Sequence, residues 1–236
     1  MSAHLAWYGD RSIAFELERR HRKTLEISVL PTGGVRVVAP FSAHLDEVSA
    51  RVSKRGRWIE AQQRFFAQFE PRTPTRTFVP GETHLYLGRQ YRLRVSEDGP
   101  QSIKLSRGFL SVQGVRPGDA LAVEHLVRAW YVTHAEEQFR RRLEINRQRF
   151  ADPDKHLPVS VVLRSMPEKW GSMSPRGRLS LNPDLVRAPA DAIDYVITHE
   201  LCHLDVPNHS RQFYDLQNSV IPDWRRRKLR LERALA

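Results

Sequence analysis

The first segment that could carry out chemistry combines two histidines with a glutamate. It consists of His199-Glu200-Leu201-Cys202-His203. On an α-helix each residue advances by ~100°, so the two imidazoles lie about 40° apart on one face, where they can share a metal ion. The carboxylate flanks them, and residues 193–197 are apolar enough for a buried helix. The spacing therefore predicts an active-site helix that carries two metal ligands and a base.

A third ligand has to come from outside this helix, and His209 is the first candidate. Asp205, Pro207 and Asn208 are residues that end helices, and they would let the chain turn back toward the metal. Three protein ligands leave one coordination position for water, as in catalytic zinc sites. We therefore expect one zinc ion per chain, held by three histidines.

The residue types also predict the reaction. A bound zinc ion lowers the pKa of its water from near 16 toward ~7, and Glu200 would take a proton from that water as it attacks. This chemistry is hydrolysis.

Several alternatives remain beside this interpretation. A five-residue motif can arise by chance on a surface helix, and His209 could be a solvated turn residue, with Asp215 or Asp223 as the third ligand. Cys202 lies inside the motif, but its helical angle favours packing as a small hydrophobic side chain.

Further short motifs occur on both sides of the metal-binding segment. From residue 170 onward they are Trp170-Gly171-Ser172, Leu181-Asn182, Ile193-Asp194-Tyr195, Asn208-His209-Ser210 and Pro222-Asp223-Trp224; upstream they are Trp58-Ile59, Gly81-Glu82, Tyr86-Leu87-Gly88-Arg89 and Tyr91. In order and approximate spacing they resemble the YgjP-like metal-dependent hydrolases, relatives of the SprT-like zinc metalloproteases. The resemblance covers nearly the whole chain.

The resemblance implies a zincin-like fold around the motif, zinc on His199, His203 and His209, and Glu200 as catalytic base. This agrees with the interpretation of the residues themselves.

Three positions, in two of these motifs, depart from the pattern of these relatives. Lys169 and Met173 stand where the relatives usually have Arg and Cys, and Tyr214 stands where they have Trp. These departures bear on the substrate rather than on the metal.

Composition favours a globular protein inside the cell. A chain of 236 residues with 40% hydrophobic content can bury a substantial core, and its single cysteine provides no disulfide framework. Asp10 and Arg11 interrupt the start of the chain before a signal-peptide core forms, and no run approaches ~18 apolar residues. We expect a cytoplasmic protein without a membrane span.

The net charge of +11 is concentrated in the first half of the chain. Residues 1–118 hold 19 Lys/Arg against 11 Asp/Glu, whereas residues 119–236 hold 19 against 16. This excess could contact nucleotides or nucleic acid, or it could simply be a solvated surface. The dense run at 225–230 is expected to be the exposed face of a terminal helix.

The elements that must position the site divide into a β-rich half and a helical half. The expected strands are 13–19, 25–30, 35–39, 84–87, 90–95, 103–105 and 109–112, followed by 159–163 and 178–181. Turns are expected at 31–34 and at Gly88, a helix from Ser42 to about 66 with a weak point at Gly56, a break at 71–80, and one long amphipathic helix over 119–150. We expect an α+β protein with a β-rich N-terminal region, 1–118, and a zincin-like metallopeptidase region, 119–236.

Three functions compete on this evidence. The first is hydrolysis of polypeptides by a metallopeptidase. The second is a metal-dependent pyrophosphatase acting on nucleotide phosphoanhydrides, with arginines binding the phosphates, although such enzymes often use two metals bridged by carboxylates. The third is a metal-stabilised binding module without catalysis, for which Glu200 would have no role.

Overall fold

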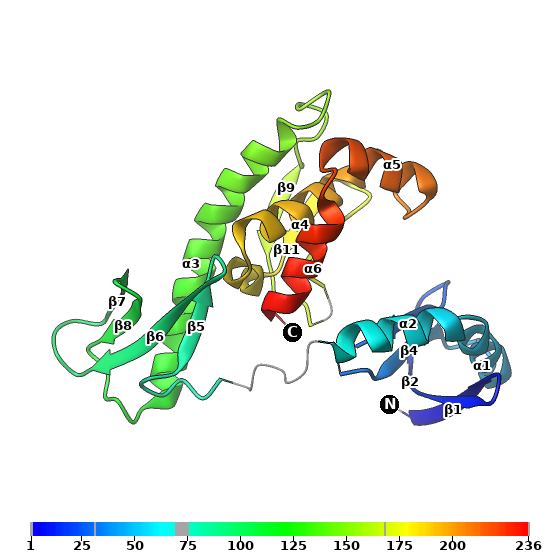
Figure 1. Cartoon of the computed structure of the whole chain (residues 1–236), viewed down its shortest axis with the longest axis horizontal. Helices are drawn as coiled ribbons and strands as arrows, with labels where there is room; N and C mark the ends of the chain where they lie inside the picture. Colours follow the sequence, from blue (N-terminus) through cyan, green and yellow to red (C-terminus); the bar gives the residue numbers. More distant parts are fainter. Residues whose placement is uncertain (1, 31, 69–75, 168, 236) are drawn as a thin grey trace. The chain divides into compact units, whose positions relative to one another are not determined.

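The chain folds into two compact units of mixed α and β structure. The computed structural model describes residues 2–30, 32–68, 76–167 and 169–235. The first unit comprises Met1–Thr73 and the second Pro74–Leu235 (Figure 1). Each unit has its own hydrophobic core. The expected α+β class and the β-rich beginning of the chain are confirmed. No helix within the described residues is both long and apolar enough to cross a membrane.

The first unit is a four-stranded sheet with two helices against one face. Its elements are β1 (Ser2–Tyr8), β2 (Arg11–Arg20), β3 (Glu26–Val29), β4 (Val35–Pro40), α1 (Leu45–Lys54) and α2 (Gly56–Ala67). The strand order is β1-β2-β4-β3, in which β2 and β4 run parallel and the outer pairs run antiparallel. Strand β2 alternates between buried and exposed residues, because only one of its faces meets the core.

The helical pattern after β4 forms two helices instead of one. Helix α1 ends at Lys54 and α2 begins at Gly56, with Arg55 between them. Glycine is a poor helix former, so a break at the expected weak point is consistent with its intrinsic propensity. The expected N-cap at Ser42 is wrong: His44 occupies that position without a side-chain hydrogen bond.

The second unit begins with a sheet of the same topology. Its strands are β5 (Thr83–Tyr86), β6 (Arg89–Ser96), β7 (Ser102–Ser106) and β8 (Phe109–Gln113), in the order β5-β6-β8-β7. The expected hairpin around Gly88 is confirmed, and Gly88 adopts a φ of 77°, a conformation that glycine reaches without strain. Of the expected break at 71–80, residues 71–75 lie outside the described residues.

A single long helix joins this sheet to the rest of the unit. Helix α3 (Ala120–Arg147) confirms the expected long helix. Asp119 is its N-cap, and the Asp119 side chain accepts a hydrogen bond from the Ala122 backbone N–H. Its first half packs on the sheet, where Val123 and Val127 share one core with Leu110. The division expected after residue 118 therefore does not coincide with the compact units, because this packing joins the sheet to the helix.

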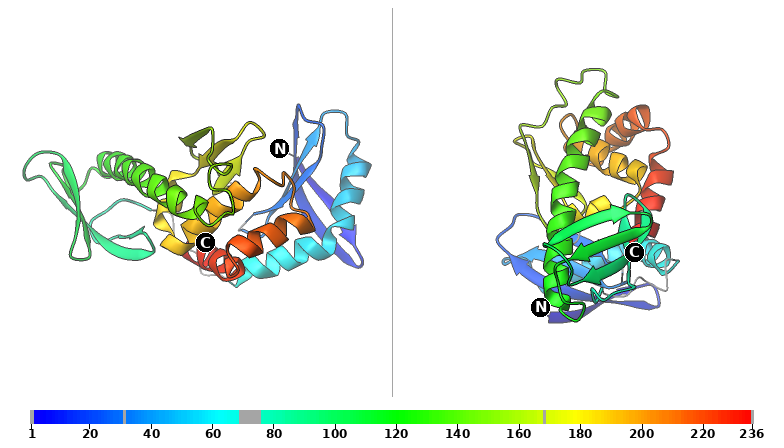
Figure 2. Two further views of the ribbon diagram at one scale, coloured as in Figure 1. Left: turned by 90° about the horizontal axis from the view of Figure 1, so that it is seen from above. Right: turned by 90° about the vertical axis from the view of Figure 1, so that its left-hand side faces the viewer.

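The last part of the second unit surrounds one buried helix. Its elements are β9 (Ser160–Leu163), β10 (Gly171–Met173), β11 (Arg178–Leu181), a 3₁₀ helix (Pro183–Arg187), α4 (Ala190–Cys202), α5 (Arg211–Val220) and α6 (Trp224–Leu235). Strands β9–β11 form a sheet in the order β10-β11-β9, which leaves β10 at an edge. Figure 2 shows α3 extending from the second sheet to lie along α4.

Candidate metal centre and catalytic cleft

The helix that carries the HExxH motif is the most buried helix of the second unit. From Ala192 to Thr198 every residue of α4 is buried, which fits the apolar sequence expected for this segment. His199 and Glu200 lie in the last turn, the helix ends at Cys202, and His203 caps it with a helical backbone conformation. The two histidines therefore keep the one-turn spacing that places them on one face.

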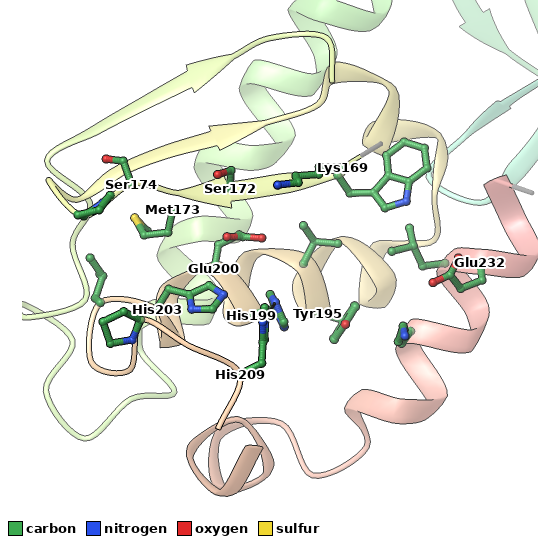
Figure 3. Close-up of a pocket in the computed structure, with 18 residues that line it drawn as sticks. Lys169, Ser172, Met173, Ser174, Tyr195, His199, Glu200, His203, His209 and Glu232 are labelled. Carbon is green, nitrogen blue, oxygen red and sulfur yellow. Dashed lines mark hydrogen bonds between the residues drawn. The ribbon is translucent and has the colours of Figure 1, made fainter. Parts of the chain in front are cut away.

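Three histidine rings meet at the end of this helix. His199, His203 and His209 each offer a ring nitrogen, and these atoms lie within 4.8 Å of one another. The Nε2 atoms of His199 and His209 are 3.0 Å apart (Figure 3). His209 reaches the cluster from the loop between α4 and α5, one residue before the N-cap of α5. The structure thus brings together the three expected ligands.

Two of the rings are held through their other nitrogen. The Nδ1 of His199 lies 2.8 Å from the side-chain oxygen of Gln217, and the Nδ1 of His203 lies 3.1 Å from the backbone oxygen of Val206. Both partner oxygens are acceptors, so these contacts suit the tautomer that has its proton on Nδ1 and a lone pair on Nε2, the nitrogen that can then bind a metal. Burial also lowers the pKa of His199 to about 3, which favours the neutral form that binds metals.

Gln217 is the residue of this site that the sequence interpretation missed. It lies on α5 and is 1% exposed, and its Nε2 has no hydrogen-bond partner among the described residues. Burying an unpaired amide nitrogen costs free energy, so a glutamine at this position needs a favourable contact elsewhere in its side chain. The contact of its side-chain oxygen with His199 is that interaction. The available signal was its position four residues after Phe213, the spacing that places two side chains on one face of a helix, but no helix was predicted over this segment.

Glu200 lies beside the histidine cluster and packs against strand β10. Figure 3 shows it between the strand that carries Met173 and the three histidine rings. Burial raises the pKa of Glu200 to about 7, and a backbone hydrogen bond from Met173 opposes that increase. A Cβ atom on Gly171 would lie 2.8 Å from Cγ of Glu200, so only glycine leaves room for the carboxylate in this position.

These side chains line one cleft. Its volume is about 530 Å³, and its walls come from β10, α4, α6 and the loop before α5; they include the three histidines, Glu200, Tyr195, Trp170, Lys169, Lys228 and Glu232. The free edge of β10 borders this cleft along its whole length, since Gly171, Ser172 and Met173 all line it.

The alternative ligands lie outside the histidine cluster. Within the described chain, Asp215 pairs with Arg211 of its own helix, and Asp223 pairs with Arg226 and Arg227. Cys202 is fully buried in the core, and burial raises the pKa of its thiol to about 12. A buried thiol of this kind packs as a hydrophobic side chain.

A buried ionic network anchors α4 to its neighbours. The carboxylate of Asp194 accepts hydrogen bonds of 2.7 Å from both Arg142 and Asn146 on α3, and Arg227 on α6 lies 3.7 Å away. Asn146 in turn accepts a hydrogen bond from Thr198, directly before the first histidine. The network fixes the helix about one turn before the HExxH segment.

Comparison with protein families identifies the class of this chain. The YgjP-like metallopeptidase domain matches residues 23–234, nearly the whole sequence. The chain belongs to the YgjP-like family, as the resemblance of its motifs indicated. A comparison with curated proteins found no significant match.

Proposed function

We propose that this protein is a zinc-dependent peptidase in which His199, His203 and His209 hold one metal ion and Glu200 acts as general base. The observation that carries the proposal is the convergence of the three rings beside a buried carboxylate in one cleft. The family match supports a metal-dependent peptidase in general terms. The choice of zinc and the roles of the individual residues rest on the chemistry of the site.

The donor set fits zinc. Neutral imidazole nitrogens are typical zinc ligands. Such a ligand is usually oriented by a hydrogen bond from its other ring nitrogen, and the Nδ1 atoms of His199 and His203 make contacts of this kind. When bound, the metal would lower the pKa of a water molecule and polarise the scissile carbonyl.

Glu200 would perform the proton transfers. Its carboxylate accepts one proton from the attacking water while the oxygen forms a bond to the carbonyl carbon, and it returns that proton to the departing amine as the C–N bond breaks. A base with a pKa near the working pH suits both steps, and burial in the cleft provides such a value. The Met173 N–H would hold the carboxylate by a hydrogen bond, and the absence of a side chain at Gly171 leaves room for it.

Strand β10 would hold the substrate. An extended polypeptide can add to a free sheet edge through backbone hydrogen bonds, whatever its side chains are. The edge is three residues long and lies directly beside Glu200. This short edge would therefore position the scissile bond while leaving sequence preference to the rest of the cleft.

Phosphoanhydride hydrolysis remains the second candidate because Lys169 and Lys228 line the same cleft and could contact phosphates. Against it, the described residues provide no carboxylate cluster for a second metal. A binding module without catalysis would not require Glu200 to be buried beside the ligands.

Metal removal and restoration would test the proposal. Protein stripped with a chelator should not cleave an unstructured polypeptide, and one equivalent of zinc should restore cleavage, with fragments identified by mass spectrometry. Restoration by magnesium but not by zinc would contradict the donor-set argument, because magnesium prefers oxygen ligands.

A further inference from the structure

The first unit contains a second hollow, which the hydrolytic chemistry does not use. It has a volume of about 920 Å³ and lies where α1 meets α2, beside Leu25 and Ile27. Four cations and one aromatic ring line it: Arg51, Lys54, Arg55, Arg57 and Trp58. None of the acidic side chains in the described part of the chain lines it. We call this region the basic hollow.

The cations of the basic hollow lack carboxylate partners within the described chain. Four other arginines of the same unit are paired with carboxylates: Arg11 with Glu60, Arg20 and Arg36 with Glu18, and Arg22 with Glu26. Among the described residues, no such ion pair involves the four cations of the basic hollow. Four neighbouring positive charges without counterions repel one another, so an anion placed among them would be attracted.

The lining also contains a flat apolar surface. The ring of Trp58 is 39% exposed, and Leu25 and Ile27 of the β3 region line the hollow beside it. Tryptophan is a large side chain that normally buries most of its surface. Here it stays at the rim of a concave and strongly basic surface.

We propose that the basic hollow binds single-stranded nucleic acid, with phosphates against the cations and a base stacked on Trp58. Such sites combine a positively charged groove with aromatic rings, and both elements are present here. A phosphate backbone supplies one charge per nucleotide whatever its sequence, and arginine binds phosphate with two parallel hydrogen bonds. The carboxylates of an acidic polypeptide would neutralise the cations but would offer no aromatic ring to stack on Trp58. The site is separate from the proposed peptidase chemistry and does not depend on it.

Binding of a fluorescent oligothymidylate to the whole protein, followed by anisotropy at several salt concentrations, tests this proposal. The double variant Lys54→Gln/Arg57→Gln should bind at least about 10-fold more weakly, and its slope of log K against log salt should be smaller by about 1.4, because each phosphate contact to a single strand contributes ~0.7. The matched control is Lys104→Gln/Arg149→Gln, which removes one exposed lysine and one exposed arginine elsewhere. It should behave as the parent protein does.

The ring provides an independent test. Trp58→Ala should weaken oligonucleotide binding by about 5-fold or more without changing the salt slope, since stacking involves no counterion release. The assignment of the site would be overturned if Lys54→Gln/Arg57→Gln and its control bound the oligonucleotide equally well, or if Trp58→Ala did not change the affinity. If polyglutamate competes as well as the oligonucleotide and its binding is insensitive to Trp58→Ala, the basic hollow is instead a surface for acidic polypeptides. Circular dichroism of each variant verifies that it is folded.

Discussion

The two four-stranded sheets of this protein share strand order and strand directions, but the helices that follow them differ. Strand order β1-β2-β4-β3 in the first unit corresponds to β5-β6-β8-β7 in the second, with a parallel central pair in each. The first sheet is followed by two short helices broken at Arg55, and the second by one helix of 28 residues. One topology thus supports either an exposed helix junction or a continuous helix.

The two units also differ in whether certain charged side chains are exposed or buried. At the break in the first unit, exposed cations lie around Trp58 and have no carboxylate partner among the residues that the structure describes. The continuous α3 of the second unit instead brings Arg142 and Asn146 to the buried Asp194, and so fixes the helix of the proposed active site. The groups of this network in the second unit are buried and held by specific partners, whereas the cations of the basic hollow in the first unit are exposed and make no ion pair among the described residues.

The largest expected effect is on metal binding. His209→Ala should weaken zinc binding by about 10³-fold, because each ligand of such a site contributes several kcal/mol. Competition with a chromophoric chelator measures this, and His125→Ala, an exposed histidine on α3, is the matched control. If Asp215→Asn weakens zinc binding as much and His209→Ala does not, the ligand set is wrong.

Breaking the buried network should reduce stability. Asp194→Asn keeps the shape of the side chain but leaves Arg142 and Arg227 without their buried counterion, which should lower the free energy of unfolding by about 2–3 kcal/mol. Calorimetry of the whole protein, in which the transition of the second unit should move to lower temperature, measures the change. An unchanged transition would mean that α4 does not depend on this contact.

Gln217 should affect the metal indirectly. Gln217→Leu removes the acceptor for His199 Nδ1 and should reduce zinc affinity by about 10- to 100-fold, the usual effect of losing such a partner. Gln217→Glu, which keeps an acceptor at the same place, should recover most of it. Nitrogen chemical shifts of His199 would report the tautomer. Equal zinc affinity of the Leu variant and the parent would limit Gln217 to packing.

A smaller effect should follow from filling the space beside the base. Gly171→Ala places a Cβ against the Glu200 side chain and should slow turnover by about 10-fold while zinc content is kept, because a small displacement of a catalytic group has a large cost. Gly118→Ala is the control, since a Cβ there meets nothing within 4 Å. Lower zinc content in the Gly171 variant would assign the effect to the ligands instead.

The smallest effect is expected for stability of the first unit. Lys54→Gln/Arg57→Gln should change the free energy of unfolding by less than about 0.5 kcal/mol, because both side chains are exposed and make no ion pair among the described residues. Denaturant titration measures it. A clear loss of stability would show that these cations are structural, and the contrast between the two units would no longer hold.

The sequence predicted the histidine cluster better than the fold around it. Helical spacing alone places His199 and His203 on one face, and the helix-ending residues correctly indicated a return of the chain at His209. Gln217 was not predicted, because it and its partner His199 lie on different helices and are 18 positions apart in sequence. Pairing of this kind depends on tertiary packing, which local patterns do not encode.

The strands and the long helix were also largely predicted, but their grouping was not. Strand β1 was missed, since its exposed Leu5 and Trp7 blur the alternation expected of a half-buried strand. The repeated topology of the two sheets was invisible as well, because the same order of strands can be built from unrelated residues. The expected cytoplasmic location stays a prediction.

The products that form from a polypeptide and from nucleotides decide whether this protein is a peptidase. Zinc-loaded protein is incubated with an unstructured polypeptide and nucleoside triphosphates together, beside a Glu200→Gln variant whose zinc content has been verified as equal, and all products are analysed by mass spectrometry. The parent protein should produce polypeptide fragments with new N-termini, at least about 10²-fold faster than the variant, and should leave the triphosphates intact. Release of pyrophosphate or phosphate that depends on Glu200, with every polypeptide intact, would contradict the peptidase assignment.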